Sequence, residues 1–309
     1  MTPRAHVPVK KVLVASDSRD ALLQAVAKAA TIEHYTGASV TALLVCHEPI
    51  TDELQLRFGH DVAARILDER LRTERQALDV ALAPWREHIA ELDFAVMFSR
   101  DTAAAICEAA LERAADLIVK PLSRSAHLAD FLHTPADWQL MRQAPCAVLF
   151  TRAAKWQKPI RVLAALDVMD KAHTALNDEI IRQAALIAAI LGGELHVATA
   201  FPSLAPYVNQ YQVAQDFTSL TIEMHDSRRD ALTRLLQRLG VEAAAIHVEE
   251  GRSRQVIPAL AALLQAGLTI VGTAGRSGLS HLLIGNTAEQ LASDLATDLL
   301  TVRATERSA

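Results

Sequence analysis

One stretch of this chain occurs twice, and the two copies are 150 residues apart. Residues 11–17, Lys-Val-Leu-Val-Ala-Ser-Asp, are matched by residues 161–167, Arg-Val-Leu-Ala-Ala-Leu-Asp. Each copy is followed by a helix-like stretch that ends at a glycine, Gly37 in the first copy and Gly192 in the second. A chain of 309 residues is long enough for about two domains. The repeat therefore predicts two copies of one folding unit rather than one large domain.

Short apolar runs alternate with helix-like stretches through both halves. Strands that are unbroken apolar runs are typical of a parallel sheet, and a repeating strand–helix order covers both faces with helices. The sequence therefore predicts an α/β fold of two tandem domains, each a five-stranded parallel sheet with helices on both faces. We expect the domains at residues 1–152 and 153–309. The expected strands are residues 11–16, 39–46, 94–98, 116–119 and 146–150 in the first half, and 161–166, 194–200, 243–248, 268–271 and 298–302 in the second.

The composition argues against several classes of protein. The formal net charge is -5 and no basic face is indicated, so we expect no nucleic-acid partner. No apolar run reaches the roughly 18 residues that a spanning helix needs, so we expect no membrane insertion. The N-terminal residues lack the apolar core of a signal peptide. Cys46, Cys107 and Cys146 are widely spaced, which is typical of free thiols in a reducing compartment. We therefore expect a cytoplasmic protein.

Glycines are concentrated between the fourth strand of the second half and the helix that follows it. Four of the 11 glycines lie here, at Gly272, Gly275, Gly278 and Gly285. Glycine lets the backbone approach an anion closely, and the free N–H groups at a helix start point toward it. The pattern indicates a phosphate-binding loop. A surface loop with turn glycines is the alternative that this pattern alone leaves open.

The first half provides an internal comparison for this loop. Aligning the fourth strands places Lys120 opposite Gly272, and Pro135 falls near the start of the following helix. All four glycines are absent from the first copy, and proline removes an N–H donor. If the loop holds a nucleotide, only the second half is expected to bind one.

The spacing of these glycines is similar to that of a known family. Gly272-x2-Gly275-x9-Gly285-Asn286, together with an aspartate at the end of the first strand, resembles the universal stress protein family. The phrases Gly-Asn-Thr-Ala-Glu at 285–289 and Thr-Pro-Ala-Asp-Trp at 134–138 resemble the E-type tandem members of bacteria. The resemblance covers essentially the whole chain. It implies domains of the adenine nucleotide alpha hydrolase-like, flavodoxin-like type, paired within the chain as a pseudo-dimer through their fifth strands.

The resemblance also implies where a nucleotide would bind. Asp167 would lie near the adenosine and a magnesium ion, and a backbone group near Val197 would touch the adenine. Gly272, Gly275 and Gly285 would approach the ribose and phosphates. Many members carry a serine or threonine after the last glycine, and here Asn286 and Thr287 would share that phosphate contact. The implied cofactor is ATP or another adenine nucleotide with magnesium.

The resemblance implies a non-enzymatic stress-response protein, and we identify no catalytic residue. Two alternatives stay open. The first is a weak ATPase or another nucleotide hydrolase, for which Asp167 is the one candidate general base. The second is an interaction protein whose pockets are empty or hold a lipid. Whether two chains form a homodimer is also left open.

A polar cluster in the first half is a candidate for metal binding. It consists of His127, Asp130, His133 and Asp137. Their spacing matches no established zinc signature, and the aligned residues of the second half are mostly apolar. We therefore interpret the cluster as an ordinary polar loop and expect no metal site there.

Overall fold

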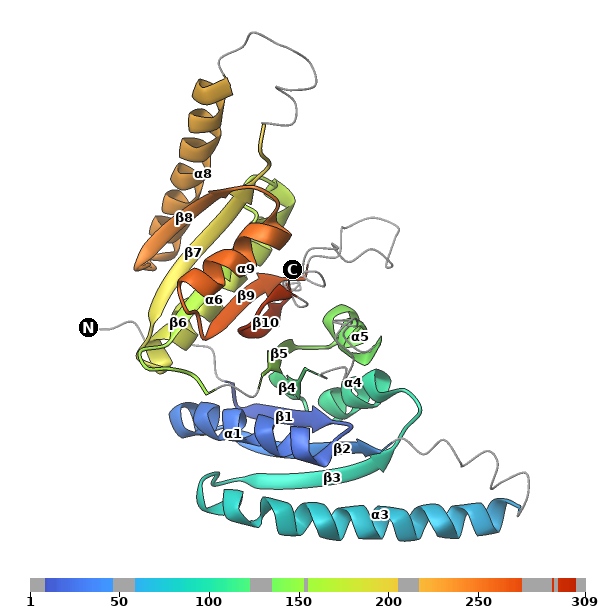
Figure 1. Ribbon diagram of the computed structural model, residues 1–309. Helices are drawn as coiled ribbons and strands as arrows, with labels where there is room; N and C mark the ends of the chain where they lie inside the picture. The colour runs from blue at the N-terminus through green and yellow to red at the C-terminus, as the bar shows by residue number, and fades with distance from the viewer. Residues whose placement is uncertain are drawn as a thin grey trace, which may run out of the picture. The chain divides into compact units, whose positions relative to one another are not determined.

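The computed structural model describes residues 9–46, 59–122, 135–152, 155–204, 217–273, 291 and 294–303. The chain separates into two compact units at residues 153–154. Each unit is a parallel sheet with helices packed on it, as Figure 1 shows. The predicted α/β class and the tandem arrangement are therefore confirmed.

The first unit contains five parallel strands in the order β3-β2-β1-β4-β5. The first strand lies in the middle, so the chain builds outward on one side and then on the other. Its elements are β1 (Lys11–Ser16), α1 (Arg19–Thr36), β2 (Ser39–Cys46), α3 (His60–Leu82), the 3-10 helix η1 (Ala83–Glu87), β3 (Leu92–Phe98), α4 (Thr102–Glu112), β4 (Leu117–Pro121), α5 (Pro135–Gln143) and β5 (Ala147–Thr151).

The second unit repeats this order as β8-β7-β6-β9-β10, again with all neighbouring strands parallel. Helices α6 and α8 pack against one another on one face of the sheet, and α9 packs on the other face (Figure 1). Its elements are β6 (Arg161–Ala165), the 3-10 helix η2 (Lys171–His173), α6 (Thr174–Ile190), β7 (Glu194–Phe201), α8 (Phe217–Leu239), β8 (Ala245–Glu250), α9 (Ser253–Leu263), β9 (Leu268–Gly272) and β10 (Asp298–Val302).

The expected alignment of the two fourth strands was wrong by one residue. Strand β4 pairs Leu117 with Val12 of β1, and β9 pairs Leu268 with Val162 of β6. Because the residues 11–17 match 161–167, Leu117 corresponds to Leu268. Lys120 then corresponds to Val271, and Pro121 takes the place of Gly272. The sequence alignment had matched the ends of the two expected strands, Val119 with Val271, whereas the strand ladder fixes the true register.

This one-residue difference decides which way Lys120 points. Successive residues of a strand face opposite sides of the sheet, so Lys120 does not share the face of Gly272. Its ammonium lies 2.5 Å from Oδ1 of Asp137, and the two side chains are 1% and 0% exposed. Lys120 Nζ also donates to the carbonyl of Pro121 at 3.2 Å. The ion pair joins the end of β4 to the first turn of α5.

The second unit lacks this ion pair. By the same correspondence, the residues that match Lys120 and Asp137 are Val271 and Ala288. The hydrogen bond from Ala144 N to Leu140 O has its match in Leu295 N to Leu291 O, which supports this alignment along the helix. The buried position that Lys120 occupies in the first unit is thus filled by the apolar Val271 in the second.

Lys120→Val and Asp137→Ala should each cost about 3–5 kcal/mol of stability when made alone, because either change leaves a buried charge without its counter-ion. The double change Lys120→Val with Asp137→Ala, which copies the second unit, should recover much of that loss. Chemical denaturation of the four proteins in a double-mutant cycle measures the coupling. Additive effects of the two substitutions would contradict a direct ion pair.

A glycine between α6 and β7 is required by a close backbone approach. A Cβ atom on Gly193 would overlap the carbonyl oxygen of Ile160, which accepts the hydrogen bond from Glu194 N at 2.8 Å. A backbone carbonyl in a strand ladder cannot move aside as a side chain can. This glycine therefore fixes how closely the end of α6 approaches the sheet.

Gly193→Ala should cost about 3 kcal/mol, at the upper end of the usual penalty for overpacking. Gly240→Ala is the matched control, since Gly240 also ends a helix but its added Cβ would meet open space. The control carries only the strain of its positive φ of 64°, which costs about 1–2 kcal/mol for a non-glycine residue. Thermal denaturation compares the two, and equal losses would show that the contact with Ile160 is unimportant.

Candidate functional site

The ends of β6 and β9 meet at the carboxyl edge of the second sheet. The ladder between these strands pairs Ala164 with Ile270. Asp167 lies two residues past the end of β6, and Gly272 is the last residue of β9. Ligands of open parallel sheets bind outside the carboxyl ends of the strands. The structure therefore brings Asp167 and Gly272, two of the predicted site residues, to the expected edge.

Asp167 has an anchored backbone and an exposed carboxylate. The buried amide of Asn177 on α6 donates to the backbone oxygen of Asp167 at 2.7 Å. The carboxylate side chain is 61% exposed, with one oxygen 3.3 Å from Nδ1 of His173 and the other 3.4 Å from the backbone nitrogen of Met169. A fixed backbone that presents an exposed carboxylate is suited to binding a hydroxyl group or a hard cation.

The absence of a side chain at Gly272 is explained by helix packing. A Cβ atom there would lie 2.5 Å from Leu176 Cδ2 and 3.1 Å from Ile180 Cδ1, both on α6. Gly272 thus lets α6 pack tightly on β9, a role that the sequence did not suggest. The chain then stays in the ladder for one more residue, because Thr273 N donates to Val302 O at 2.8 Å.

Val197 lies inside the sheet, away from this edge. It is fully buried and stands between Ala164 on β6 and Ile246 on β8. The same register places Ala200, three residues later, level with Asp167. Strand β7 extends to Phe201, so Ala200 and Phe201 lie at its carboxyl end. The expected strand 194–200 already reached Ala200, whereas the family resemblance had placed the adenine contact near Val197.

Several predicted residues lie outside the described part of the chain. These are the site residues Gly275, Gly285, Asn286 and Thr287, and three members of the polar cluster, His127, Asp130 and His133. The fourth member, Asp137, is described and binds Lys120. Sequence reasoning missed that partner, although a lysine at the end of the apolar run Leu-Ile-Val was a visible signal.

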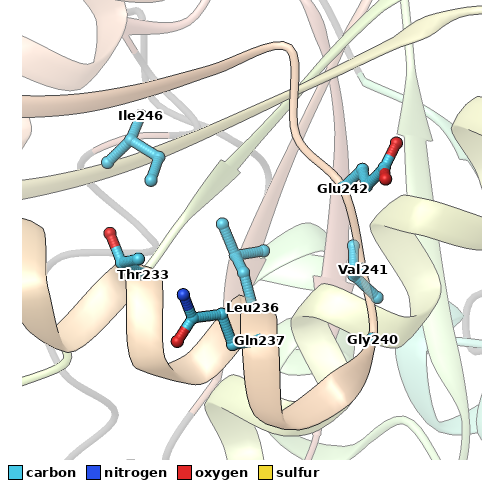
Figure 2. A pocket seen from close by; sticks show the side chains of 7 residues that line it. All are labelled: Thr233, Leu236, Gln237, Gly240, Val241, Glu242 and Ile246. Atoms are coloured by element: carbon cyan, nitrogen blue, oxygen red, sulfur yellow. The ribbon is translucent and has the colours of Figure 1, made fainter.

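Two cavities that described residues line lie elsewhere. One of about 320 Å³ sits where the end of α8 turns into β8, at the amino end of that strand. Figure 2 shows Leu236 and Ile246 facing this hollow, with Gln237 and Glu242 beside it. Another, of about 250 Å³, lies at the amino ends of β1 and β2. Neither is at the edge that holds Asp167.

The described residues contain neither a membrane-spanning helix nor a group of side chains suited to a metal ion. None of the helices in these ranges combines the length and apolarity needed to cross a membrane. Within the same ranges, no three side chains of histidine, cysteine, aspartate or glutamate are grouped so as to hold a metal ion.

Comparisons with solved structures support the fold. A functionally unknown protein of Pseudomonas aeruginosa PAO1 is 27% identical with a TM-score of 0.68, and the match covers 96% of this chain and 93% of that one. A universal stress protein from Archaeoglobus fulgidus DSM 4304 is 14% identical with a TM-score of 0.60, covering 96% and 97%. The second likeness bears on the fold alone.

Sequence comparisons identify the family of this chain. The universal stress protein E homolog of Haemophilus influenzae is 29% identical over 94% of this chain and 95% of its own length. Universal stress protein E of Escherichia coli K12 is 30% identical over 64% of each. The model of the universal stress protein family matches residues 8–152 and again 161–303. The chain thus belongs to the universal stress protein family, with two of its domains in tandem.

Proposed function

We propose that this chain is a stress-response protein whose second unit binds an adenine nucleotide without turning it over. The observation that carries the proposal is the meeting of Asp167 and Gly272 at the carboxyl edge of the second sheet. The glycine-rich stretch begins at this edge, and its spacing is the one that resembles nucleotide-binding members of the family.

Asp167 would bind the magnesium ion that accompanies the phosphates. Magnesium prefers carboxylate and water oxygens and usually keeps several waters while it bridges one or two carboxylates to phosphate. One exposed carboxylate at the mouth of the site fits that demand. The imidazole of His173 is a poor ligand for this ion, so the carboxylate would give up its contact with His173 when the ion binds.

The phosphates would be held by residues assigned from sequence. Gly275 and Gly285 would allow the backbone N–H groups to approach, and Asn286 and Thr287 would donate from an amide and a hydroxyl. The adenine would contact the backbone of β7, and the strand register favours Ala200 for this role over Val197.

The first unit is expected to stay empty, because its equivalent edge is built differently. Pro121 stands where Gly272 lets the helix approach, and the Lys120–Asp137 pair fills the interior behind it. We therefore propose one nucleotide per chain. The intramolecular pseudo-dimer, a homodimer of chains, the domain limits 1–152 and 153–309 and the cytoplasmic location stay predictions.

A hydrolase is the second candidate, and one observation favours it. Nδ1 of His173 lies 3.3 Å from the carboxylate of Asp167, an arrangement that can orient an imidazole as a general base. An assay of ATP turnover in the wild type and Gly275→Val separates the candidates. A rate that falls in the variant supports a hydrolase, and equal rates indicate a contaminating enzyme.

Calorimetry on ligand-free protein should show one ATP bound per chain, with tighter binding in the presence of magnesium. Asp167→Asn should weaken that binding about tenfold or more, since it removes the charge that faces the ion, and a tenfold loss corresponds to about 1.4 kcal/mol. Asp17→Asn is the matched control, because Asp17 ends the first strand of the other unit. Equal losses in the two variants, or no binding of ATP, ADP or AMP to the wild type, would refute the proposal.

Gly272, at the end of β9, is a poor position for a substitution that tests nucleotide binding. Gly272→Ala would disturb the packing of Leu176 whether or not a nucleotide binds there. Gly275→Val is therefore the better glycine variant for the binding assay. If native mass spectrometry finds a co-purifying lipid instead of a nucleotide, that result would support the alternative of an interaction protein.

A further inference from the structure

Two histidines on neighbouring strands of the second unit meet through their side chains. His196 is on β7 and His247 is on β8, and the ladder pairs them with Ala245 and Ala198 respectively. They are therefore diagonal neighbours on the same face of the sheet. His196 is also level with Leu163, well before Asp167, so the pair takes no part in the proposed nucleotide site.

The two rings are joined by a hydrogen bond between ring nitrogens. Nδ1 of His196 lies 3.1 Å from Nε2 of His247, whereas the ring centroids are 5.4 Å apart. The planes differ by only 27°. The nitrogen–nitrogen distance is far shorter than the centroid distance, so the rings meet edge to edge with these two nitrogens facing. One nitrogen must carry the hydrogen and the other must offer its lone pair.

The burial of His196 makes this bond important to the strand pair. His196 is 8% exposed, and in the described structure its second nitrogen, Nε2, is buried without a hydrogen-bond partner. His247 is half-buried. A buried polar ring that loses its hydrogen bond costs about 1–3 kcal/mol of desolvation. The contact with His247 therefore satisfies a group that would otherwise destabilise the sheet.

Charged groups lie on both sides of the pair. Glu194 Oε2 lies 3.7 Å from His196 Nε2 and also accepts from Arg161 Nε at 3.3 Å. Burial lowers the pKa of His247, with a further lowering by His196 and Arg229 and an opposing effect of Glu249. On the packed helix α9 the one charged residue is Arg254, which is exposed. With both rings protonated, neither facing nitrogen can accept, and two cations share the contact.

The same geometry disfavours a metal site. A metal ion would need the lone pairs of both nitrogens to converge on a third point, whereas here they point at each other across 3.1 Å. Within the described ranges, no third histidine, cysteine or carboxylate completes a group of ligands around them. A shared proton is the chemistry that this arrangement fits.

We propose that the His196–His247 bond is a pH-sensitive latch that holds β8 to β7 and opens when both histidines are protonated. Among the described strands, β8 ends the order of the second sheet and has β7 as its one partner. Helix α8 packs on β8, so loosening the strand also loosens the helix. Acid would thus open one side of the second unit and leave the strand pairs around β6 closed.

The direction of the pH effect follows from the lowered pKa. Below a pH of about 6.5, the usual pKa of histidine, the unfolded chain takes up a proton that folded His247 resists. The latch therefore contributes its full stability above that pH. The contribution falls as the pH drops from about 6.5 toward the pKa of the folded state.

Hydrogen exchange at pH 7.5 and 5.5, corrected for the intrinsic rates, tests the latch directly. The amides of residues 245–250 should lose protection in the wild type at pH 5.5, by at most about tenfold, because pH 5.5 is about one unit below the usual pKa of histidine. His247→Gln should show less change, because glutamine can still bond Nδ1 of His196 but takes up no proton. His225→Gln, at an exposed histidine of α8 that contacts Asp226, should behave as the wild type.

A second measurement keeps the proposal testable if His247→Gln fails to fold. NMR titration of the imidazole nitrogens in the wild type should show His247 titrating below 6.5. Equal loss of protection in all three proteins, or a His247 that titrates at or above 6.5, would overturn the latch.

Discussion

The hydrogen-bond ladder between β6 and β9 is the constraint on which the candidate site depends. It aligns β6 with β9, whose carboxyl ends lead to Asp167 and Gly272, and it fixes which face of β9 each side chain occupies. A slip of one residue would turn Gly272 away from α6 and put Val271 against Leu176. The close packing of α6 on β9 therefore stabilises the strand register. The register in turn determines which residues lie at the carboxyl edge.

Much of the fold could be predicted because its strands are unbroken apolar runs that occur twice in the same order. The site was harder to predict, for reasons that individual residues show. Val197 was assigned from the family resemblance, whereas the strand register places it inside the sheet and β7 continues to Phe201. Lys120 was misaligned because the two expected fourth strands were matched at their ends, Val119 with Val271, and only the strand ladder gives their true register. Gly275, Gly285, Asn286 and Thr287 lie outside the described residues, so their roles stay predictions.

Polar side chains inside the two units have different kinds of partner. Lys120 and Asp137 are fully buried and neutralise each other's charge. The buried His196 and the half-buried His247 are joined by a hydrogen bond between their rings. A pair of fixed opposite charges gives a contact that is stable over a wide range of pH, whereas a pair of imidazoles changes within the range near neutrality. The first kind of contact suits a fixed scaffold, and the second suits a part that responds to its surroundings.

The buried ion pair also limits how the first unit can change over evolutionary time. Either residue replaced alone leaves a charge in the interior, so single substitutions at Lys120 or Asp137 pass through a poorly folded intermediate. The second unit has Val271 and Ala288 at the matching sequence positions. Reaching that combination from Lys120 and Asp137 requires both residues to change together. The two halves share one fold. A buried ion pair in one half cannot be converted into the apolar residues of the other through single substitutions that each keep the protein stable.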